Sequence, residues 1–124
     1  MKILLIEDSK FSQKVAAKML SQVFPDAELI LADNGVIGYE RFQQIRPDVI
    51  VTDLLMPRMG GQELIKKIRQ SDSHVLIFAL TADVQQSTKE GLVQYHIAAF
   101  INKPLNQEKL ALVQAIVEKR FHDA

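Results

Sequence analysis

The chain has 124 residues, and 48% of them are hydrophobic, which is enough apolar material for the core of one compact domain. Lysine plus arginine and aspartate plus glutamate number 15 each. The chain therefore lacks the net charge that attracts nucleic acid or an anionic membrane, and we expect it to bind neither directly. The absence of cysteine excludes disulfides and thiol catalysis, and it fits a cytoplasmic location.

Five short apolar segments predict β-strands. Four of them are nearly continuous rather than alternating, which is typical of strands buried on both faces, and the second is weaker and suits a sheet edge. The first segment leads straight into acidic residues without a cleavage-site pattern, so we interpret it as a strand rather than a signal peptide. The predicted strands are Ile3–Ile6, Leu29–Ala32, Val49–Thr52, Val75–Leu80 and Ala98–Ile101.

The segments between these strands carry apolar residues at helical spacing. Strand and helix therefore alternate along the chain, and right-handed crossovers turn such a repeat into a doubly wound α/β domain. We predict a flavodoxin-like (βα)5 fold, with five parallel strands in the order 2-1-3-4-5, formed by residues 1–124 as a single domain. The predicted apolar stripes are Phe11, Val15 and Met19; Tyr39, Phe42 and Ile45; Leu64, Ile65 and Ile68; and Leu110, Val113, Val117 and Phe121.

Polar residues follow the predicted strands at the edge where ligands bind in this topology. Glu7 and Asp8 follow the first strand, Asp53 follows the third, Thr81 ends the fourth, and Lys103 follows the fifth. Each alone suits a helix cap or a solvated loop. Together, three crowded carboxylates favour a bound cation, and oxygen ligands suit Mg²⁺. Mg²⁺, Lys103 and Thr81 can then each contact one oxygen of a phosphoryl group in transfer.

Four short motifs at these strand ends resemble, in order and spacing, the motif set of response-regulator receiver domains. They are Ile6-Glu7-Asp8, Thr52-Asp53-Leu54-Leu55-Met56-Pro57 with Gly61, Ala79-Leu80-Thr81-Ala82, and Asn102-Lys103-Pro104. The resemblance implies that Asp53 is the phosphoacceptor and that Lys103 and Thr81 hold the phosphoryl group. It implies that Mg²⁺, for which Mn²⁺ can substitute, is bound by Glu7, Asp8, Asp53 and the main-chain carbonyl of Leu55. It also implies a cis Lys103–Pro104 peptide bond, which is a minority state of X-Pro bonds.

The same resemblance implies a signalling domain that catalyses only its own phosphorylation and dephosphorylation and is not otherwise an enzyme. The phosphoryl donor would be a histidine kinase or a histidine phosphotransfer protein. The Ala79–Ala82 and Phe11–Val15 segments also resemble receivers of hybrid kinases and phosphorelays. Thr81 and Phe100 are then the switch residues.

The switch would alter one face of the molecule, which binds a downstream target or a second copy of the chain. This face consists of the helix beginning near Val84, the fifth strand, and the helix from Asn106 to Arg120. Leu55 and Asp83 would flank the approach to the phosphoryl group.

Two features depart from the family pattern. His96 stands where receivers usually have a glycine that ends the fourth helix, so His96 must adopt a left-handed backbone or the helix must end differently. Ala98 and Ala99 replace a common acidic pair, which we expect to alter partner contacts rather than chemistry.

Other functions compatible with this fold find less support. A flavin or nucleotide enzyme needs a turn of small residues that offers amides after the first strand, and Glu7-Asp8-Ser9-Lys10 offers carboxylates instead. A phosphatase with an aspartyl nucleophile needs a second aspartate two residues further on, and position 10 is lysine. The remaining alternative is a degenerate receiver that acts only as a protein-interaction module, although every chemical position is present.

Overall fold

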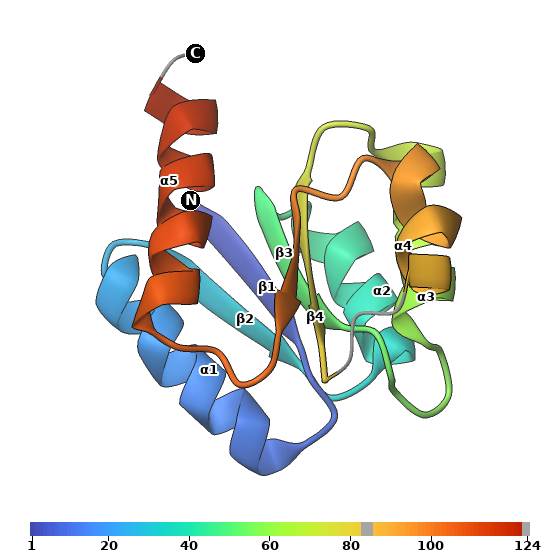
Figure 1. Cartoon of the computed structure of the whole chain (residues 1–124), viewed down its shortest axis with the longest axis horizontal. Helices are drawn as coiled ribbons and strands as arrows, with labels where there is room; N and C mark the ends of the chain where they lie inside the picture. Colours follow the sequence, from blue (N-terminus) through green and yellow to red (C-terminus); the bar gives the residue numbers. More distant parts are fainter. Residues whose placement is uncertain (83–85, 123–124) are drawn as a thin grey trace.

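The computed structural model describes residues 1–82 and 86–122, which form a five-stranded parallel sheet with helices on both faces (Figure 1). The strands are β1 (Lys2–Ile6), β2 (Glu28–Ala32), β3 (Val49–Asp53), β4 (Leu76–Thr81) and β5 (Ala99–Asn102). They pair in the order β2-β1-β3-β4-β5. The predicted fold class and strand order are therefore confirmed, and each predicted strand lies within one residue of its observed bounds.

The helices divide into two groups, one on each face of the sheet. α1 (Lys10–Val23) and α5 (Gln107–His122) cover one face, while α2 (Gly35–Ile45), α3 (Gly61–Ser71) and α4 (Gln86–Leu92) cover the other, with a 3₁₀ turn at Val93–Tyr95 following α4 (Figure 1). None of the helices formed by the described residues combines the length and apolarity needed to cross a bilayer.

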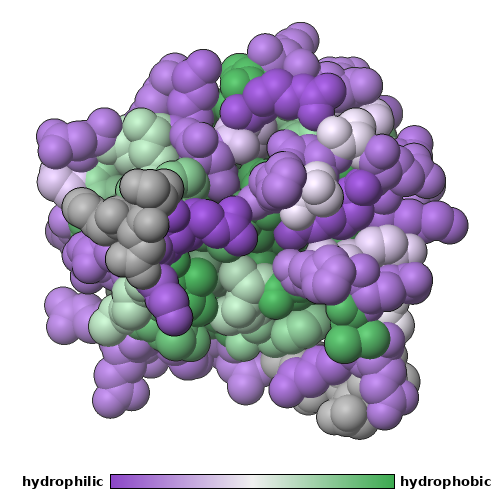
Figure 2. Space-filling model, turned by 90° about the horizontal axis from the view of Figure 1, so that it is seen from above, coloured by the Kyte–Doolittle hydropathy of each residue, from purple (hydrophilic) through white to green (hydrophobic). Residues whose placement is uncertain are grey.

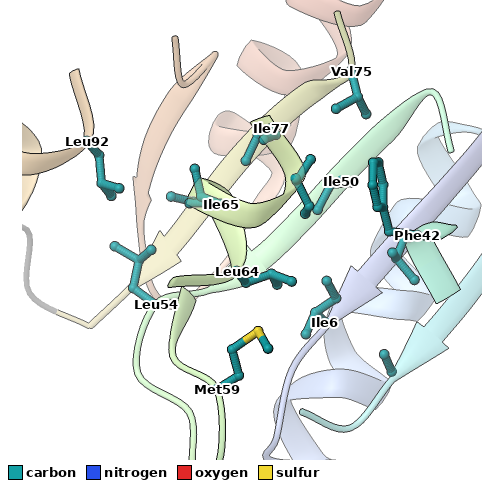
Figure 3. Packing of buried hydrophobic residues seen from close by; sticks show 14 residues of the cluster. Ile6, Phe42, Ile50, Leu54, Met59, Leu64, Ile65, Val75, Ile77 and Leu92 are labelled. Atoms are coloured by element: carbon teal, nitrogen blue, oxygen red, sulfur yellow. The ribbon is translucent and has the colours of Figure 1, made fainter. Parts of the chain in front are cut away.

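Each face of the sheet has its own apolar core. On the α2–α3–α4 face, Phe42, Leu64, Ile65 and Ile68 pack with Leu92 against alternate residues of β1, β3 and β4 (Figure 3). On the α1–α5 face the buried helical residues are Ala16, Leu20, Leu110, Val113 and Val117. The central strands are buried on both sides, which explains why their sequences are continuously apolar.

The predicted apolar stripe of α1 was wrong for Phe11 and Val15, whereas Met19 is partly buried against the core. Phe11 is 78% exposed and Val15 is also exposed, whereas Gln13, Ala16 and Leu20 are the buried residues of this helix. The small Ala16 side chain lies against the core, while Phe11, in the first turn, lines a groove beside the site end of the sheet. Helical periodicity alone fits both faces of α1, and the buried glutamine hid the correct one.

Phe121, the last residue of the predicted α5 stripe, is also exposed. α5 extends past the amino ends of the strands, so its last turn has no sheet to cover (Figure 1). Met1, Phe24, Val117 and Phe121 line a cavity there between α1 and α5. Figure 2 views this end of the molecule, where hydrophobic side chains gather among hydrophilic ones.

The 3₁₀ turn after α4 ends at His96, which has a φ of 55° in the left-handed region. The structure thus combines both solutions expected for a helix end without glycine, a left-handed residue and an altered last turn. The guanidinium of Arg69, at the end of α3, donates to the carbonyl oxygens of Tyr95 at 2.7 Å, Asp72 at 3.1 Å and His96 at 3.2 Å. These bonds satisfy carbonyls that the end of a helix leaves without a partner.

The predicted helix start near Val84 and the flanking Asp83 lie outside the described residues, within which α4 begins at Gln86.

Gly35, the first residue of α2, touches the loop that follows β3. A β-carbon at Gly35 would lie 2.1 Å from the carbonyl oxygen of Met59, and Met59 itself is buried beside Ile6 and Leu64 (Figure 3). Because backbone rather than a flexible side chain blocks this space, the loop can descend onto the core only if position 35 is glycine.

We predict that Gly35→Ala lowers the free energy of unfolding by about 1–3 kcal/mol, because the methyl group displaces the loop after β3. Gly91→Ala is the matched control: a β-carbon there meets nothing within 4 Å, so helix propensity alone should leave stability unchanged or raise it by about 0.4–1 kcal/mol. Urea unfolding of both variants measures the difference. Equal stabilities would contradict the close approach at Gly35.

Candidate functional site

The structure brings the polar residues of four strand ends together at one edge of the sheet. Asp53 is the last residue of β3, Thr81 is the last residue of β4, and Glu7 and Lys103 follow β1 and β5 directly. The strand register aligns Asp53 with Leu80 and Thr81 with Asn102, so these strands end at nearly the same level. Their side chains therefore share one small volume at the carboxyl edge.

The ammonium group of Lys103 lies between two buried carboxylates. Its Nζ is 2.7 Å from Oε2 of Glu7 and 2.9 Å from Oδ2 of Asp53. Glu7 is only 1% exposed and Asp53 only 5%. The other oxygen of each carboxylate accepts a backbone N–H, from Ser9 at 3.1 Å for Glu7 and from Leu55 at 3.2 Å for Asp53. Both carboxylates are thus fixed from two sides.

Asp8 completes an acidic cluster with these two residues. One carboxylate oxygen from each of Glu7, Asp8 and Asp53 lies within 4.8 Å of the others, and the Asp8 side chain is exposed to solvent. Three carboxylates against one ammonium leave two negative charges in a partly buried site, which a divalent cation would balance. All the ligands are oxygens, so the residues fit Mg²⁺ or Mn²⁺.

The pKa values of the ion pair reflect this crowding. Burial raises the pKa of Glu7 above its ordinary value, and the negative charge of Asp53 adds to this, while hydrogen bonds from Lys103 and Ser9 oppose it. Burial lowers the pKa of Lys103, but hydrogen bonds and charge from Glu7 and Asp53 outweigh burial and raise it overall. Lys103 is therefore a fixed cation at neutral pH.

The raised pKa of Glu7 has a consequence for stability. Because folded Glu7 binds its proton more tightly than unfolded Glu7, its carboxyl group favours the folded state most below the ordinary glutamate pKa. That contribution is lost as the pH rises through the raised pKa of the folded protein.

The remaining predicted residues surround this centre. Thr81 is 4% exposed, and the Leu55 side chain is 75% exposed. Phe100 is half-buried on β5 opposite Ala79, packs on the α2–α3–α4 face, and has the Lys89 ammonium 6.0 Å from its ring centroid. The Lys103–Pro104 peptide bond is cis, so that implication of the resemblance is confirmed.

Three residues next to the site were missed in the sequence. Gln13 is buried and donates from Nε2 to the carbonyl oxygens of Glu7 at 3.2 Å and Ala32 at 3.3 Å and to Oδ1 of Asp33 at 3.0 Å. Lys10 pairs with the same Asp33 oxygen at 2.7 Å. The available signal was the spacing of Gln13 with Ala16 and Leu20, which places a polar residue on the buried face of α1.

The family model of the response regulator receiver domain matches residues 3–116. The chain belongs to this family. Receiver domains are signalling domains of two-component systems rather than ordinary enzymes, and they interact with histidine kinases and phosphotransfer partners.

Relatives of this receiver domain range from small regulators to large kinases. It is 28% identical to the chemotaxis protein CheY of Halobacterium salinarum over 92% of each chain. It is 33% identical to the hybrid signal transduction histidine kinase D of Dictyostelium discoideum, covering 87% of this chain and 7% of that protein. It spans 47% and 52% of two probable C4-dicarboxylate response regulators. The chain thus covers about half or less of several relatives.

Solved structures agree with the fold. The chemotaxis response regulator CheY4 of Vibrio cholerae aligns with a TM-score of 0.82 and 26% identity over 93% of this receiver domain and 97% of that chain. The Mn²⁺-bound form of the response regulator Rcp1 aligns with a TM-score of 0.72 and 24% identity over 98% of this receiver and 93% of that chain.

We predict that Lys103→Met raises the pKa of Glu7 further in the metal-free protein, because the hydrogen bond from Lys103 is the strongest effect that lowers it. Carboxyl-carbon NMR across a pH titration measures the pKa directly. Lys14→Met, which removes an exposed ammonium from α1, is the control and should leave the pKa of Glu7 unchanged. An unchanged or lower Glu7 pKa in Lys103→Met would contradict this account of the ion pair.

Proposed function

We propose that this receiver domain accepts a phosphoryl group on Asp53 from a phosphohistidine of a partner protein. The observation that carries the proposal is the Lys103 ammonium bound to both Glu7 and Asp53 beside the exposed carboxylate of Asp8. The arrangement combines a fixed carboxylate nucleophile, a fixed cation and a donor set for a divalent metal, which are the elements that phosphoryl transfer requires.

In the transfer, a carboxylate oxygen of Asp53 forms a bond to phosphorus, and the N–P bond of the phosphohistidine breaks with its electron pair going to the imidazole. Asp53 is already oriented by the N–H of Leu55 and by Lys103, so little reorganisation is needed before attack. Lys103 then transfers its hydrogen bond from the carboxylate to a phosphoryl oxygen, and the Thr81 hydroxyl donates to another.

Glu7, Asp8, Asp53 and the main-chain carbonyl of Leu55 would hold Mg²⁺, with Mn²⁺ as a substitute. When bound, the ion supplies positive charge to the phosphoryl oxygens as charge develops on them. Without that charge, two uncompensated negative charges would repel an incoming phosphate. The chain itself then acts by position and charge, and it catalyses only its own phosphorylation and dephosphorylation.

A groove next to the carboxylates would seat the donor. Phe11, Val15, Pro104 and Leu105 supply apolar walls, while Glu7 and Lys103 form the end that adjoins the site. An exposed phenylalanine at such a place is suited to packing against an apolar helix of a histidine kinase or a histidine phosphotransfer protein. The donor imidazole would then approach Asp53 from the α1 side.

Phosphorylation would change the surface formed by α4, β5 and α5. Thr81, drawn toward the phosphoryl group, leaves room behind it for the ring of Phe100, which has no hydroxyl and so gains no hydrogen bond in either position. Exposed apolar side chains are available near these elements, Val93 in the 3₁₀ turn after α4 and Leu112 on α5. A downstream target, or a second copy of the chain, would bind there.

We predict that acetyl phosphate adds the mass of one phosphoryl group to the wild type only when Mg²⁺ is present and adds none to Asp53→Asn. Intact-mass spectrometry measures the increment, and beryllofluoride binding, followed by amide NMR, detects a competent site whose phosphoryl group is short-lived. No increment and no beryllofluoride binding would instead favour the degenerate, protein-binding receiver.

The donor for this test is a histidine phosphotransfer protein that phosphorylates the wild type. We predict that Phe11→Ala slows this reaction roughly tenfold or more, as expected for truncation of a contact residue worth at least 1.4 kcal/mol. The rate with acetyl phosphate should not change, because Phe11 belongs to the groove and not to the carboxylate cluster. Phe121→Ala, which truncates an exposed phenylalanine at the far end of α5, should change neither rate. A loss with both donors would refute the docking role.

A further inference from the structure

The buried amide of Gln13 lies where β1, β2 and α1 meet. Its side chain is 5% exposed, and its Nε2 faces three acceptors, the carbonyl oxygens of Glu7 and Ala32 and Oδ1 of Asp33, at 3.2, 3.3 and 3.0 Å. A primary amide nitrogen has two N–H donors and does not accept hydrogen bonds, so three oxygens around Nε2 suit it, although two of them must share one hydrogen. Gln13 is therefore a buried donor to two backbone carbonyls and one carboxylate, not a solvated side chain.

One of these acceptors joins the first two acids of the site. The carbonyl of Glu7 belongs to the peptide unit between Glu7 and Asp8, so its orientation sets the direction in which both side chains leave the backbone. The N–H of Glu7 is already bound to the carbonyl of Ala32 at 3.1 Å, and the carbonyl of Ala32 also accepts from Gln13. Gln13 thus closes a ring of hydrogen bonds that joins Glu7, the residue after β1, to Ala32, the last residue of β2.

The third acceptor holds Gln13 in place. Asp33 follows β2, and its Oδ1 receives the amide of Gln13 and the ammonium of Lys10. Hydrogen bonds from Lys10 and then from Gln13 keep the pKa of Asp33 below its ordinary value, so Asp33 is ionised at neutral pH and remains an acceptor. The amide of Gln13 is consequently bound to Asp33 after β2 while it donates to the carbonyl of Glu7 after β1.

We propose that Gln13 is a positioning residue for the divalent metal, acting through the Glu7–Asp8 peptide unit. This inference rests on the proposed function, because it concerns the same carboxylates. Asp8 is exposed, so packing does not fix its carboxylate, and repulsion from Glu7 and Asp53 tends to turn it away from them. A neutral donor on the backbone resists that movement without adding a cation that would compete with the metal.

The main test is Mg²⁺ affinity, measured by isothermal titration calorimetry and by amide NMR of residues 7–9, without any phosphoryl donor. Gln13→Met keeps the length and volume of the side chain but removes its donors, and we expect it to weaken Mg²⁺ binding roughly 10–100-fold, as observed for residues that orient metal ligands. Gln22→Met, the same change on the exposed side of α1, should bind Mg²⁺ like the wild type.

A second control separates positioning from general stability. Ala16→Gly loosens the buried face of α1 and costs about 1 kcal/mol through helix propensity, but it removes no hydrogen bond to Glu7. We expect it to lower the unfolding temperature while leaving Mg²⁺ affinity within twofold of the wild type. Gln13→Asn gives an independent variant that retains a polar amide should Gln13→Met not fold; its shorter side chain cannot reach the Glu7 carbonyl, so it should also bind Mg²⁺ more weakly.

The outcomes are distinguishable. If the wild type binds Mg²⁺ and the Gln13 variants bind it equally well, the positioning role is refuted and the proposed function stands. If Ala16→Gly weakens binding as much as Gln13→Met, the effect is one of stability and the inference is also refuted. If the wild type binds no Mg²⁺, the metal part of the proposed function fails, and this inference fails with it.

Discussion

The ammonium of Lys103 is shared by two buried carboxylates that come from different parts of the chain. Moving a single carboxylate out of water costs several kcal/mol, and two adjacent ones repel each other as well. Lys103 offsets this cost only because the strands that carry Glu7, Asp53 and Lys103 end at one edge of the sheet. The order of the strands is therefore a condition for this ion pair, since β1 and β3 must be neighbours for their acids to meet.

The rest of the structure keeps that edge in place. Continuous apolar strands are buried on both faces and give a rigid platform, while the loops above it are secured by particular contacts. Met59 packs into the core over Gly35, Asp53 receives the N–H of Leu55, and Gln13 binds the carbonyl that follows β1. Polar and apolar contacts thus both stabilise the loops at this edge of the sheet, where the acidic side chains repel one another.

Most of the fold and the position of the site could be predicted from the sequence, for different physical reasons. Strands buried on two faces have an unmistakable apolar continuity, and the rule that ligands bind at the carboxyl edge of a parallel sheet directed attention to Glu7, Asp53, Thr81 and Lys103. The contacts among these residues depend on side-chain rotamers and on register, and no pattern in one sequence encodes them.

The buried face of α1 was not predicted, because apolar spacing measures hydrophobicity and not burial. Phe11 and Val15 have the spacing of a core stripe but line an open groove, while Gln13 is polar and buried because three oxygens surround it. A residue that is retained for its partners, rather than for its own hydropathy, is invisible to a periodicity argument.

The guanidinium of Arg69 joins two elements through the backbone. Each of the three bonds that it makes within the described part of the chain goes to a main-chain oxygen, of Tyr95, His96 or Asp72. The hydrogen bonds that join α3 to the turn after α4 therefore do not depend on which side chains stand at positions 95 and 96, as long as the backbone follows the same path. Other features limit those positions, because Tyr95 packs against the core on the α2–α3–α4 face and His96 has a left-handed backbone.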